Sequence, residues 1–180
     1  MTLGFISDTH GYLDDFLRAS EILKDADKIL HLGDVLAHGP RNAIIEGYNP
    51  KALGEILKNR DDITYLRGNC DADVDEMVTG KDISKKEIFL EWEDLKIFAT
   101  HGYLESEEDR IKKAVDLGAN VIITGHTHIK VAKKIGEILI LNPGSTSLPK
   151  DESKSLIKYQ NRKFYFINVE NGEIIKTFEI

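Results

Sequence analysis

The sequence predicts an α/β fold in which two β-sheets pack face to face and helices cover their outer sides. The first two-thirds of the chain alternate strand-like and helix-like runs, as expected where helices connect the strands of a sheet. After Ile129 the pattern changes to short strands separated by turn residues, which is typical of antiparallel hairpins. The 180 residues fit one domain of ordinary size, spanning residues 1–180.

Apolar periodicity places the elements of the first part. Strands are predicted at residues 3–6, 28–32, 63–66, 86–92, 95–99 and 121–123. A first helix covers about residues 12–24, a second begins at Pro50, and a third is capped by Ser106 and ends at Gly118. Their predicted apolar faces are Leu13, Phe16, Leu17 and Leu23, then Ala52, Leu53, Ile56 and Leu57, and last Ile111, Ala114 and Val115.

The last part of the chain reads as hairpins. Gly136-Glu137 separates strands predicted at 131–135 and 138–141, and Pro143-Gly144 fits a turn. Asn171-Gly172, a strong hairpin signal, separates strands at 164–169 and 174–178.

Composition narrows the class of protein. Apolar residues make up 41% of the chain and are spread evenly, as expected of a soluble globular protein. No apolar run could span a membrane, and the N-terminus lacks the basic and apolar regions of a secretory signal, so we expect no membrane partner. The single cysteine, Cys70, cannot form an internal disulfide, which makes the cytoplasm the expected compartment.

The charge balance narrows the choice of partner. The formal net charge is −7, from 24 basic and 31 acidic residues. Long nucleic acids bind mainly through Lys and Arg that neutralise phosphates, and this chain has no dense basic stripe, so we expect no long nucleic acid as partner. A small anionic substrate fits if bound metal supplies the local positive charge.

A side chain that can bind metal follows five of the predicted strands, each time beside a glycine. The motifs are Asp8-Thr9-His10-Gly11, Gly33-Asp34, Gly68-Asn69, His101-Gly102 and Gly125-His126-Thr127-His128. Ligands of open α/β sheets bind beyond the carboxyl ends of the strands, so these side chains converge if the strands are neighbours. Asp-x-His and His-x-His also fit a strand edge, where alternate residues point the same way.

The chemistry of this set suits two divalent ions. Imidazole, carboxylate and amide oxygen together favour Mn, Fe, Zn, Co or Ni over Ca. Seven ligands exceed one tetrahedral site but can divide between two ions if a carboxylate bridges them, and we expect Asp34 to bridge because it stands alone between the paired motifs. Any one of these residues is commonplace as a helix cap or core residue, so only the ordered set favours a metal centre. A site of the metallo-β-lactamase type is disfavoured because Ile129-Lys130 follows His128.

The ordered motifs resemble those of the calcineurin-like metallophosphoesterases. The matching residues are Asp8-x-His10, Gly33-Asp34, Gly68-Asn69-x-Asp71, His101-Gly102 and Gly125-His126-Thr127-His128. Residues 33–42, 46–48 and 142–145 are similar to the small bacterial and archaeal YfcE-type phosphodiesterases, so the resemblance covers nearly the whole chain.

This resemblance implies a four-layer αββα sandwich of two mixed sheets flanked by helices. It assigns one divalent ion to Asp8, His10, Asp34 and His128, and the other to Asp34, Asn69, His101 and His126. Manganese is favoured for both ions, with Ni, Fe, Zn or Co as alternatives. The implied activity is that of a phosphodiesterase for small phosphodiester substrates, in which a hydroxide held by the metals attacks phosphorus, with Asp34, Asn69 and His101 in the catalytic set. Small relatives often self-associate, which leaves a homo-oligomer open.

Cys70, His38 and Asp71 are weaker candidates for the substrate pocket. Many family members have histidine in place of Cys70, where it helps to protonate the leaving group or to bind phosphate. We therefore expect Cys70 to be a small residue that lines the pocket. Without the histidine, we also expect faster turnover of diesters with good leaving groups than of alkyl monoesters. A covalent nucleophile or a thiolate ligand at this position is disfavoured.

Four residues, Asp71 and His38 among them, have two possible roles each. Asp71 either caps the short helix after it or orients a ligating histidine. His38, in a loop, is either solvated or in contact with substrate. Arg41 either meets a phosphate or forms an ion pair within its loop, and His31, inside a strand, belongs to the core or stands behind the metal ligands.

Two other functions are alternatives. A protein-interaction scaffold on the same fold, like the eukaryotic retromer subunit, has lost several metal ligands, whereas this chain keeps every expected one. A nuclease is disfavoured by the acidic charge and by a length that leaves no room for an added DNA-binding domain.

Overall fold

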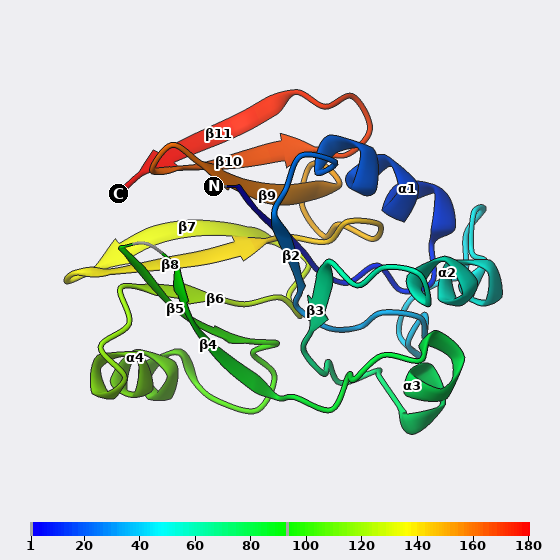
Figure 1. Ribbon diagram of the computed structural model, residues 1–180, viewed down its shortest axis with the longest axis horizontal. Helices are drawn as coiled ribbons and strands as arrows, with labels where there is room; N and C mark the ends of the chain where they lie inside the picture. Colours follow the sequence, from blue (N-terminus) through cyan, green and yellow to red (C-terminus); the bar gives the residue numbers. More distant parts are fainter. Residues whose placement is uncertain (1, 93) are drawn as a thin grey trace.

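The computed structural model describes residues 2–92 and 94–180 and shows two β-sheets packed against each other, with helices on their outer sides (Figure 1). The strands are β1 (Leu3–Ile6), β2 (Lys28–His31), β3 (Ile63–Tyr65), β4 (Glu87–Trp92), β5 (Leu95–Thr100), β6 (Val121–Ile123), β7 (Lys130–Ile135), β8 (Ile138–Pro143), β9 (Ser155–Gln160), β10 (Lys163–Asn168) and β11 (Ile174–Glu179). The helices are α1 (Leu13–Ile22), α2 (Pro50–Leu57), α3 (Asp73–Thr79) and α4 (Glu107–Asp116).

Both sheets are mixed. The first has the order β11-β10-β9-β1-β2-β3 and the second the order β4-β5-β6-β8-β7. Within the first sheet β1, β2 and β3 are parallel, and within the second β5, β6 and β8 are parallel. The remaining neighbours pair antiparallel. The predicted αββα sandwich of two mixed sheets is thereby confirmed.

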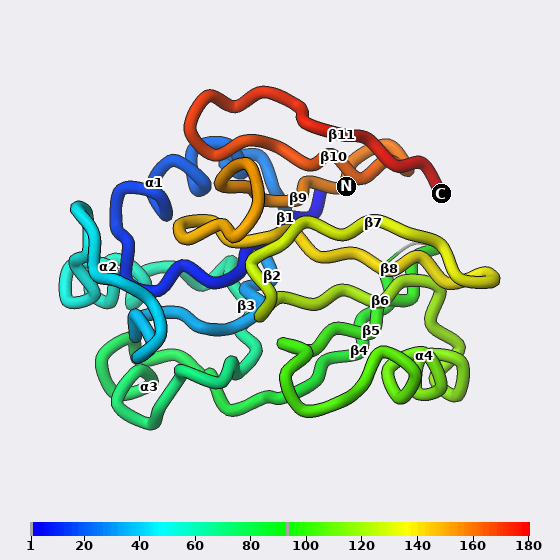
Figure 2. Tube along the Cα trace, turned by 180° about the vertical axis from the view of Figure 1, so that it is seen from behind, coloured from blue at the N-terminus to red at the C-terminus, as the bar shows by residue number. Residues whose placement is uncertain are grey.

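Apolar side chains separate the four layers. Phe5, Ile97 and Phe166 belong to the cluster between the two sheets. Phe16 of α1 and Leu53 of α2 pack on the outer face of the first sheet. α4 covers the second sheet through a smaller cluster, and it lies apart from the other helices in both views (Figure 1 and Figure 2). Burial of each large apolar side chain contributes about 1.5–3 kcal/mol, so these clusters hold the layers together.

Alternate side chains of β1 point to opposite faces of the first sheet and contribute to two different apolar clusters. Phe5 points between the sheets, and Ile6 points toward α1. Gly4, on the α1 side, leaves room for the helix, because a Cβ there would lie 2.6 Å from Leu23 Cδ1. A larger residue at position 4 would therefore force the Leu23 side chain, at the end of α1, to move.

The predicted apolar faces of two helices were too wide. Leu17 is 44% exposed and Val115 is 62% exposed, whereas Phe16 and Ala114, the residues before them, are buried. Each helix touches one sheet with a narrow stripe, and the next residue along the helix is turned by about 100° away from that stripe. The two expectations are therefore wrong for Leu17 and Val115.

Two elements were not predicted as such, and one prediction was wrong. β9 was overlooked, although it lies between β1 and β10 at the centre of the first sheet. Its hairpin to β10 turns at Asn161 and Arg162, which both have positive φ, and arginine carries no turn signal. The bounds of α3 were not predicted, and β8 runs through Pro143, which we expected in a turn. None of the helices in the described part of the chain has the length and apolar character needed to cross a membrane.

Candidate functional site

The loops that follow β1, β2, β3, β5 and β6 meet at one edge of the sandwich and carry the seven predicted ligands. Backbone hydrogen bonds tie these loops together. The N–H of Asp8 donates to Gly33 O over 3.0 Å, and the N–H of His10 donates to Asp34 O over 3.0 Å. In the second sheet the N–H of Gly125 donates to His101 O over 3.1 Å. The strand order thus brings together residues that lie far apart in the sequence.

Five of the seven side chains are carried by left-handed backbone. The φ angles are 53° for Asp8, 44° for His10, 58° for Asp34, 69° for His126 and 59° for His128. The expectation that alternation along a strand presents Asp-x-His and His-x-His is wrong, because β1 ends at Ile6 and β6 at Ile123, before the ligands. Such backbone costs about 1–3 kcal/mol per residue and persists where surrounding structure fixes it, typically at functional sites.

Two glycines beside the ligands are required by close packing of the loops on one another. A Cβ on Gly68 would lie 2.1 Å from Asp34 Oδ1, and a Cβ on Gly125 would lie 2.0 Å from Ser7 Oγ. A side chain at position 68 would displace the predicted ligand Asp34, and one at position 125 would displace Ser7, the residue before Asp8. The glycines we associated with a close approach to a ligand therefore serve the contact between loops.

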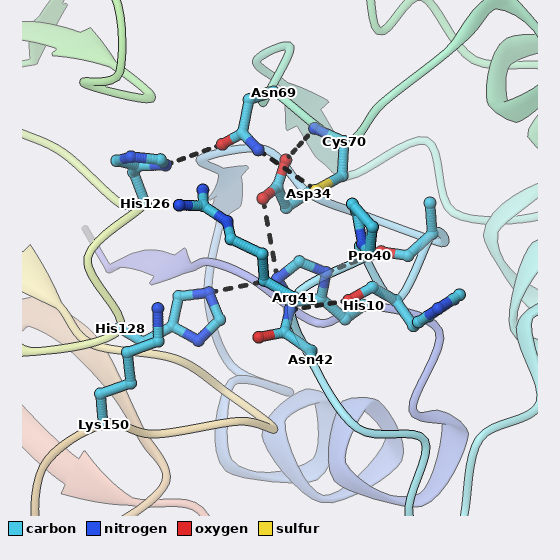
Figure 3. A pocket seen from close by; sticks show the side chains of 13 residues that line it. His10, Asp34, Pro40, Arg41, Asn42, Asn69, Cys70, His126, His128 and Lys150 are labelled. Atoms are coloured by element: carbon cyan, nitrogen blue, oxygen red, sulfur yellow. Dashed lines mark hydrogen bonds and ion pairs between the residues drawn. The ribbon is translucent and has the colours of Figure 1, made fainter.

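The first group of predicted ligands surrounds Asp8 Oδ1. Its distance to His128 Nε2 is 3.2 Å and its distance to His10 Nε2 is 3.8 Å. The two Nε2 atoms of His10 and His128 are themselves 3.2 Å apart. Three side chains from two sheets thus point their ligand atoms at one small volume (Figure 3 shows the two histidines).

The second group surrounds the amide oxygen of Asn69. Asn69 Oδ1 lies 2.7 Å from His126 Nδ1 and 3.3 Å from His101 Nε2. An amide oxygen is a neutral ligand, so this group suits a divalent ion that also has a carboxylate within reach.

Asp34 lies between the two groups. Its Oδ2 is 3.6 Å from His10 Nε2 and 3.5 Å from His101 Nε2, while its Oδ1 accepts a hydrogen bond of 2.8 Å from Cys70 N–H (Figure 3 shows the contacts to His10 and Cys70). Asp8 also approaches the second group, because its Oδ1 lies 3.9 Å from His101 Nε2.

Backbone carbonyls fix three of the four imidazoles. The Nδ1 atoms of His10, His101 and His128 lie 2.6, 2.7 and 2.6 Å from the carbonyl oxygens of Ala37, Leu32 and Leu148. A carbonyl only accepts hydrogen bonds, so each Nδ1 carries a proton and each Nε2 points into the site, where it offers a lone pair when the ring is neutral. Metal-ligating histidines are usually held in this way.

The site keeps its carboxylates ionised although they are buried. Burial alone would raise the pKa of Asp8, but His128 and His101 hold it well below its usual range. Burial would likewise raise the pKa of Asp34, yet His101 lowers it. Burial would lower the pKa of His101, but Asp34 and Asp8 raise it to about 9. A divalent ion would replace the proton on His101, because only the neutral ring can ligate.

The residues present fit divalent metal. Asp8 Oδ1 is buried and accepts no hydrogen bond from any residue that the structure describes, although Ser7 Oγ and His126 N–H donate to Asp8 Oδ2. Because the nearest groups are imidazole nitrogens with lone pairs, a cation between them would satisfy both sides. Three groups of residues each bring one ligand atom per residue to within 4.8 Å of the others in the same group. These groups are Asp8, His10 and His128; His10, Asp34 and Cys70; and Asp8, Asp34 and His101.

Both roles that we expected for Asp71 are wrong. α3 begins after Ala72, whose N–H donates to Asp75 Oδ2 over 2.6 Å, so Asp75 takes the capping role. The oxygens of Asp71 accept backbone N–H groups of Asp34, Val35 and Gly68 and contact no histidine. Burial raises the pKa of Asp71 to about 6, although these N–H groups oppose the shift. Asp71 lies behind the pocket and not on its wall.

A pocket of about 580 Å³ opens over the two groups and has Cys70 and His38 in its wall. Cys70 Sγ lies close to the loop at Gly39, where a Cβ would come within 2.9 Å of the sulfur. Burial raises the pKa of the Cys70 thiol to about 12, which disfavours a nucleophilic thiolate. The ring of His38 packs edge-on against Tyr48, with ring centres 5.6 Å apart.

The family follows from this site and from similarity to known proteins. The family model described as the calcineurin-like phosphoesterase superfamily domain matches residues 1–162. The chain belongs to the calcineurin-like phosphoesterase superfamily. Phosphodiesterase YfcE of Escherichia coli is 41% identical over 156 residues, which cover 83% of this chain and 82% of that protein. Phosphodiesterase MJ0936 of Methanocaldococcus jannaschii is 31% identical over 153 residues, which cover 80% of this chain and 83% of that protein.

Solved structures agree with this assignment to the superfamily. The structure of Yfce, described as a phosphoesterase from E. coli, matches with a TM-score of 0.89 at 35% identity and covers 100% of both chains. Vacuolar protein sorting 29 from Cryptosporidium parvum matches with a TM-score of 0.68 at 19% identity, covering 99% of this chain and 98% of that one, and shows the shared fold alone. As a member of this superfamily, the chain is a metal-dependent phosphoesterase.

Several residues that support the site escaped the sequence analysis. Asn142 Nδ2 donates to Gly125 O over 2.7 Å, and Ser145 Oγ donates to Asp8 O over 2.7 Å. Both lie in the stretch 142–145 that carried part of the family resemblance, so that stretch was the signal. Lys150 borders the pocket and gave no signal in the sequence.

Proposed function

We propose that the chain hydrolyses small phosphodiesters with two divalent ions, manganese being favoured, held by the seven side chains of the two groups. The observation that carries the proposal is the position of Asp34 Oδ2, 3.6 Å from His10 Nε2 and 3.5 Å from His101 Nε2. A carboxylate between two sets of ligands suits a bridge between two ions. The named phosphodiesterases among the relatives support the choice of a diester substrate.

The ligands divide as the resemblance implies. One ion would be held by Asp8, His10, Asp34 and His128, and the other by Asp34, Asn69, His101 and His126. When bound, such ions supply a Lewis acid for the phosphate oxygens and a hydroxide as the nucleophile. The net reaction adds water across one P–O ester bond and gives a phosphomonoester and an alcohol.

The residues of this chain contribute position and charge. Asp34 and Asp8 supply the negative charge that retains the ions, and Asn69 and the imidazoles complete the two sites without adding charge. The carbonyl oxygens that accept from the Nδ1–H groups of His10, His101 and His128 hold these rings before any ligand arrives, which lowers the cost of ordering the site.

The test of the bridge is Asp34→Asn. We expect metal content, measured by elemental analysis after loading with Mn²⁺, to fall from two ions per chain, and hydrolysis of bis(p-nitrophenyl) phosphate to fall to background. Asp61→Asn is the matched control, because Asp61 is an exposed carboxylate paired with Lys81. A variant that kept two ions and its turnover would show that Asp34 is not the bridge.

The leaving group is the second point to test. Cys70 offers no imidazole to protonate an alkoxide, and a general acid typically contributes about 10²–10⁴-fold. We therefore expect bis(p-nitrophenyl) phosphate, whose leaving group needs no proton, to react much faster than an alkyl phosphate monoester. Cys70→Ser should keep this order, and comparable rates on both substrates would contradict it.

A further inference from the structure

Two positively charged side chains border the pocket over the predicted metal site. Arg41 and Lys150 both belong to the pocket wall, and both are exposed. In Figure 3 the Arg41 side chain extends from its loop over the pocket, and the Lys150 side chain extends toward the pocket beside His128. They approach from opposite ends of the sequence, one before β3 and the other after β8.

Neither cation forms an ion pair with any residue that the structure describes. Most Lys and Arg side chains in the described residues form ion pairs, including Lys130 with Asp151 at 2.7 Å and Arg60 with Asp62 at 2.7 Å. Among residues 2–92 and 94–180, no carboxylate pairs with Arg41 or with Lys150. The ion pair within the loop that was one reading of Arg41 is therefore absent from the described part of the chain.

The segments that carry the two cations are hydrogen-bonded to predicted metal ligands. His10 Nδ1 lies 2.6 Å from Ala37 O, at the start of the loop that carries Arg41. Asn42 Nδ2 donates to His38 O over 2.7 Å and closes this loop. Lys150 N–H donates to His128 O over 2.9 Å. The fold thus holds both cations near the His10 and His128 side of the site.

A charge count shows that a simple diester leaves these cations without a counter charge. Two divalent ions bring four positive charges. Asp8 and Asp34 offset two of them, a hydroxide offsets one and the single negative charge of a phosphodiester offsets the last. Arg41 and Lys150 then remain in excess at the pocket mouth, in a chain whose net charge is −7.

We propose that Arg41 and Lys150 bind a second anionic group of the substrate, so that the preferred substrate is a phosphodiester carrying a further phosphate on one of its ester arms. Phosphate presents several acceptor oxygens to a guanidinium and an ammonium group. The pocket volume of about 580 Å³ is within the range of sites that hold ligands of this size. The proposal rests on the proposed function, because it names the substrate class of the same site.

The test compares two esters that differ only in the extra phosphate. They are thymidine 5′-(p-nitrophenyl phosphate) and the same compound bearing a 3′-phosphate. We expect kcat/KM of the Mn²⁺-loaded protein to be about tenfold higher for the 3′-phosphorylated ester, as two charge-assisted contacts would give. Arg41→Gln and Lys150→Gln should each lower this ratio several-fold. Lys112→Gln is the matched control, because Lys112 is exposed on α4, has no ion pair in the described residues and loses the same charge.

Binding provides a second measurement that does not depend on turnover. Calorimetry on the full chain, with and without Mn²⁺, compares thymidine 3′,5′-bisphosphate with thymidine 5′-monophosphate. Tighter binding of the bisphosphate that weakens with salt and is lost in Arg41→Gln and Lys150→Gln supports the proposal. Equal kcat/KM for the two esters in an active enzyme overturns it and leaves the phosphodiesterase standing. Absence of turnover on both esters overturns the proposed phosphodiesterase activity. In that case the binding measurement decides the present proposal, and equal affinity for the two nucleotides overturns it.

Discussion

The carboxylate of Asp71 lies behind Asp34 and holds its backbone. Asp71 Oδ2 accepts hydrogen bonds from Asp34 N–H over 2.8 Å and from Gly68 N–H over 2.7 Å. Asp71 Oδ1 accepts one from Val35 N–H over 2.7 Å. One buried carboxylate therefore joins the loops after β2 and β3, which carry the proposed bridge and the amide ligand.

Asp71→Asn should damage both stability and the site. Asparagine presents an NH2 group where a second oxygen is needed, so at least one buried backbone N–H loses its acceptor, at a cost of about 1–3 kcal/mol. Because Asp34 is then held less firmly, we expect Mn²⁺ affinity to fall about 10–100-fold, as for other residues that orient metal ligands. Urea unfolding and metal titration by calorimetry measure the two effects.

Asp75→Asn is the control for this prediction. Asp75 caps α3 by accepting from Ala72 N–H over 2.6 Å, so its replacement should lower stability by about 1 kcal/mol and leave the Mn²⁺ affinity unchanged. An unchanged Mn²⁺ affinity in Asp71→Asn as well would show that Asp34 does not depend on this carboxylate.

Gly68→Ala should disrupt the site through contact with Asp34. The added Cβ would lie 2.1 Å from Asp34 Oδ1 and 2.4 Å from Asp34 N, so Asp34 has to move. Overpacking of this kind costs about 1–3 kcal/mol, and we expect diesterase activity to be lost with it. Gly80→Ala separates backbone strain from contact, because Gly80 has a φ of +64° and nothing within 4 Å of the added atom. It should cost about 1–2 kcal/mol and remain fully active.

His31 should make the stability of the protein fall in mild acid. The ring is buried between the ends of β1 and β2, where its Nε2 lies 2.9 Å from Thr9 Oγ1 and its Nδ1 accepts from Gly33 N–H over 3.2 Å. Burial lowers the pKa of His31 from 6.5 to about 3. As the pH falls below 6.5, the unfolded chain takes up a proton that the folded chain refuses, so stability is lost between pH 6.5 and about pH 3.

His31→Gln removes this titration. The free energy of unfolding of the wild-type chain should fall by about 1.4 kcal/mol per pH unit, or about 2 kcal/mol between pH 6.5 and pH 5. This fall is the part that exceeds any fall in the variant. Urea midpoints at both pH values give the difference. Between pH 7.5 and pH 8.5 the two proteins should behave in parallel, since His31 is neutral in both states, and parallel behaviour down to pH 5 would contradict the assignment.

Much of the fold could be predicted because it depends on local patterns. Apolar runs marked ten of the strands, and Asn171-Gly172 marked the last hairpin. β9 was missed because its turn, Asn161-Arg162, lacks a glycine, and its position depends on pairing with β1 over more than 150 residues. A pairing at that separation leaves no local mark in the sequence.

The site was predicted as a set of residues but not as a geometry. The order of the motifs was enough to choose the seven side chains that converge. The left-handed backbone of residues such as Asp8 and His126 could not be predicted, because nothing nearby requires it and the contacts between loops impose it. Lys150 was missed for the same reason, since only its bond to His128 O places it at the pocket.

The buried Asp8 carboxylate predicts how metal changes stability. Asp8 Oδ1 has no hydrogen bond from any described residue, so a bound ion should stabilise the folded chain, by about 2.7 kcal/mol when Mn²⁺ is at 100 times its dissociation constant. Asp8→Asn should remove most of this gain. Its amide can keep the oxygen toward Ser7 Oγ and His126 N–H and donate from nitrogen to His128 Nε2, so the metal-free variant should be at least as stable as the wild type. Calorimetric unfolding in EDTA and in Mn²⁺ gives all four values.

Asp15→Asn is the control, because buried Asp15 pairs with Arg18 at 3.3 Å and Lys154 at 3.0 Å and its replacement should lower stability equally in both conditions. An Asp8→Asn chain that gained as much from Mn²⁺ as the wild type would remove Asp8 from the metal site.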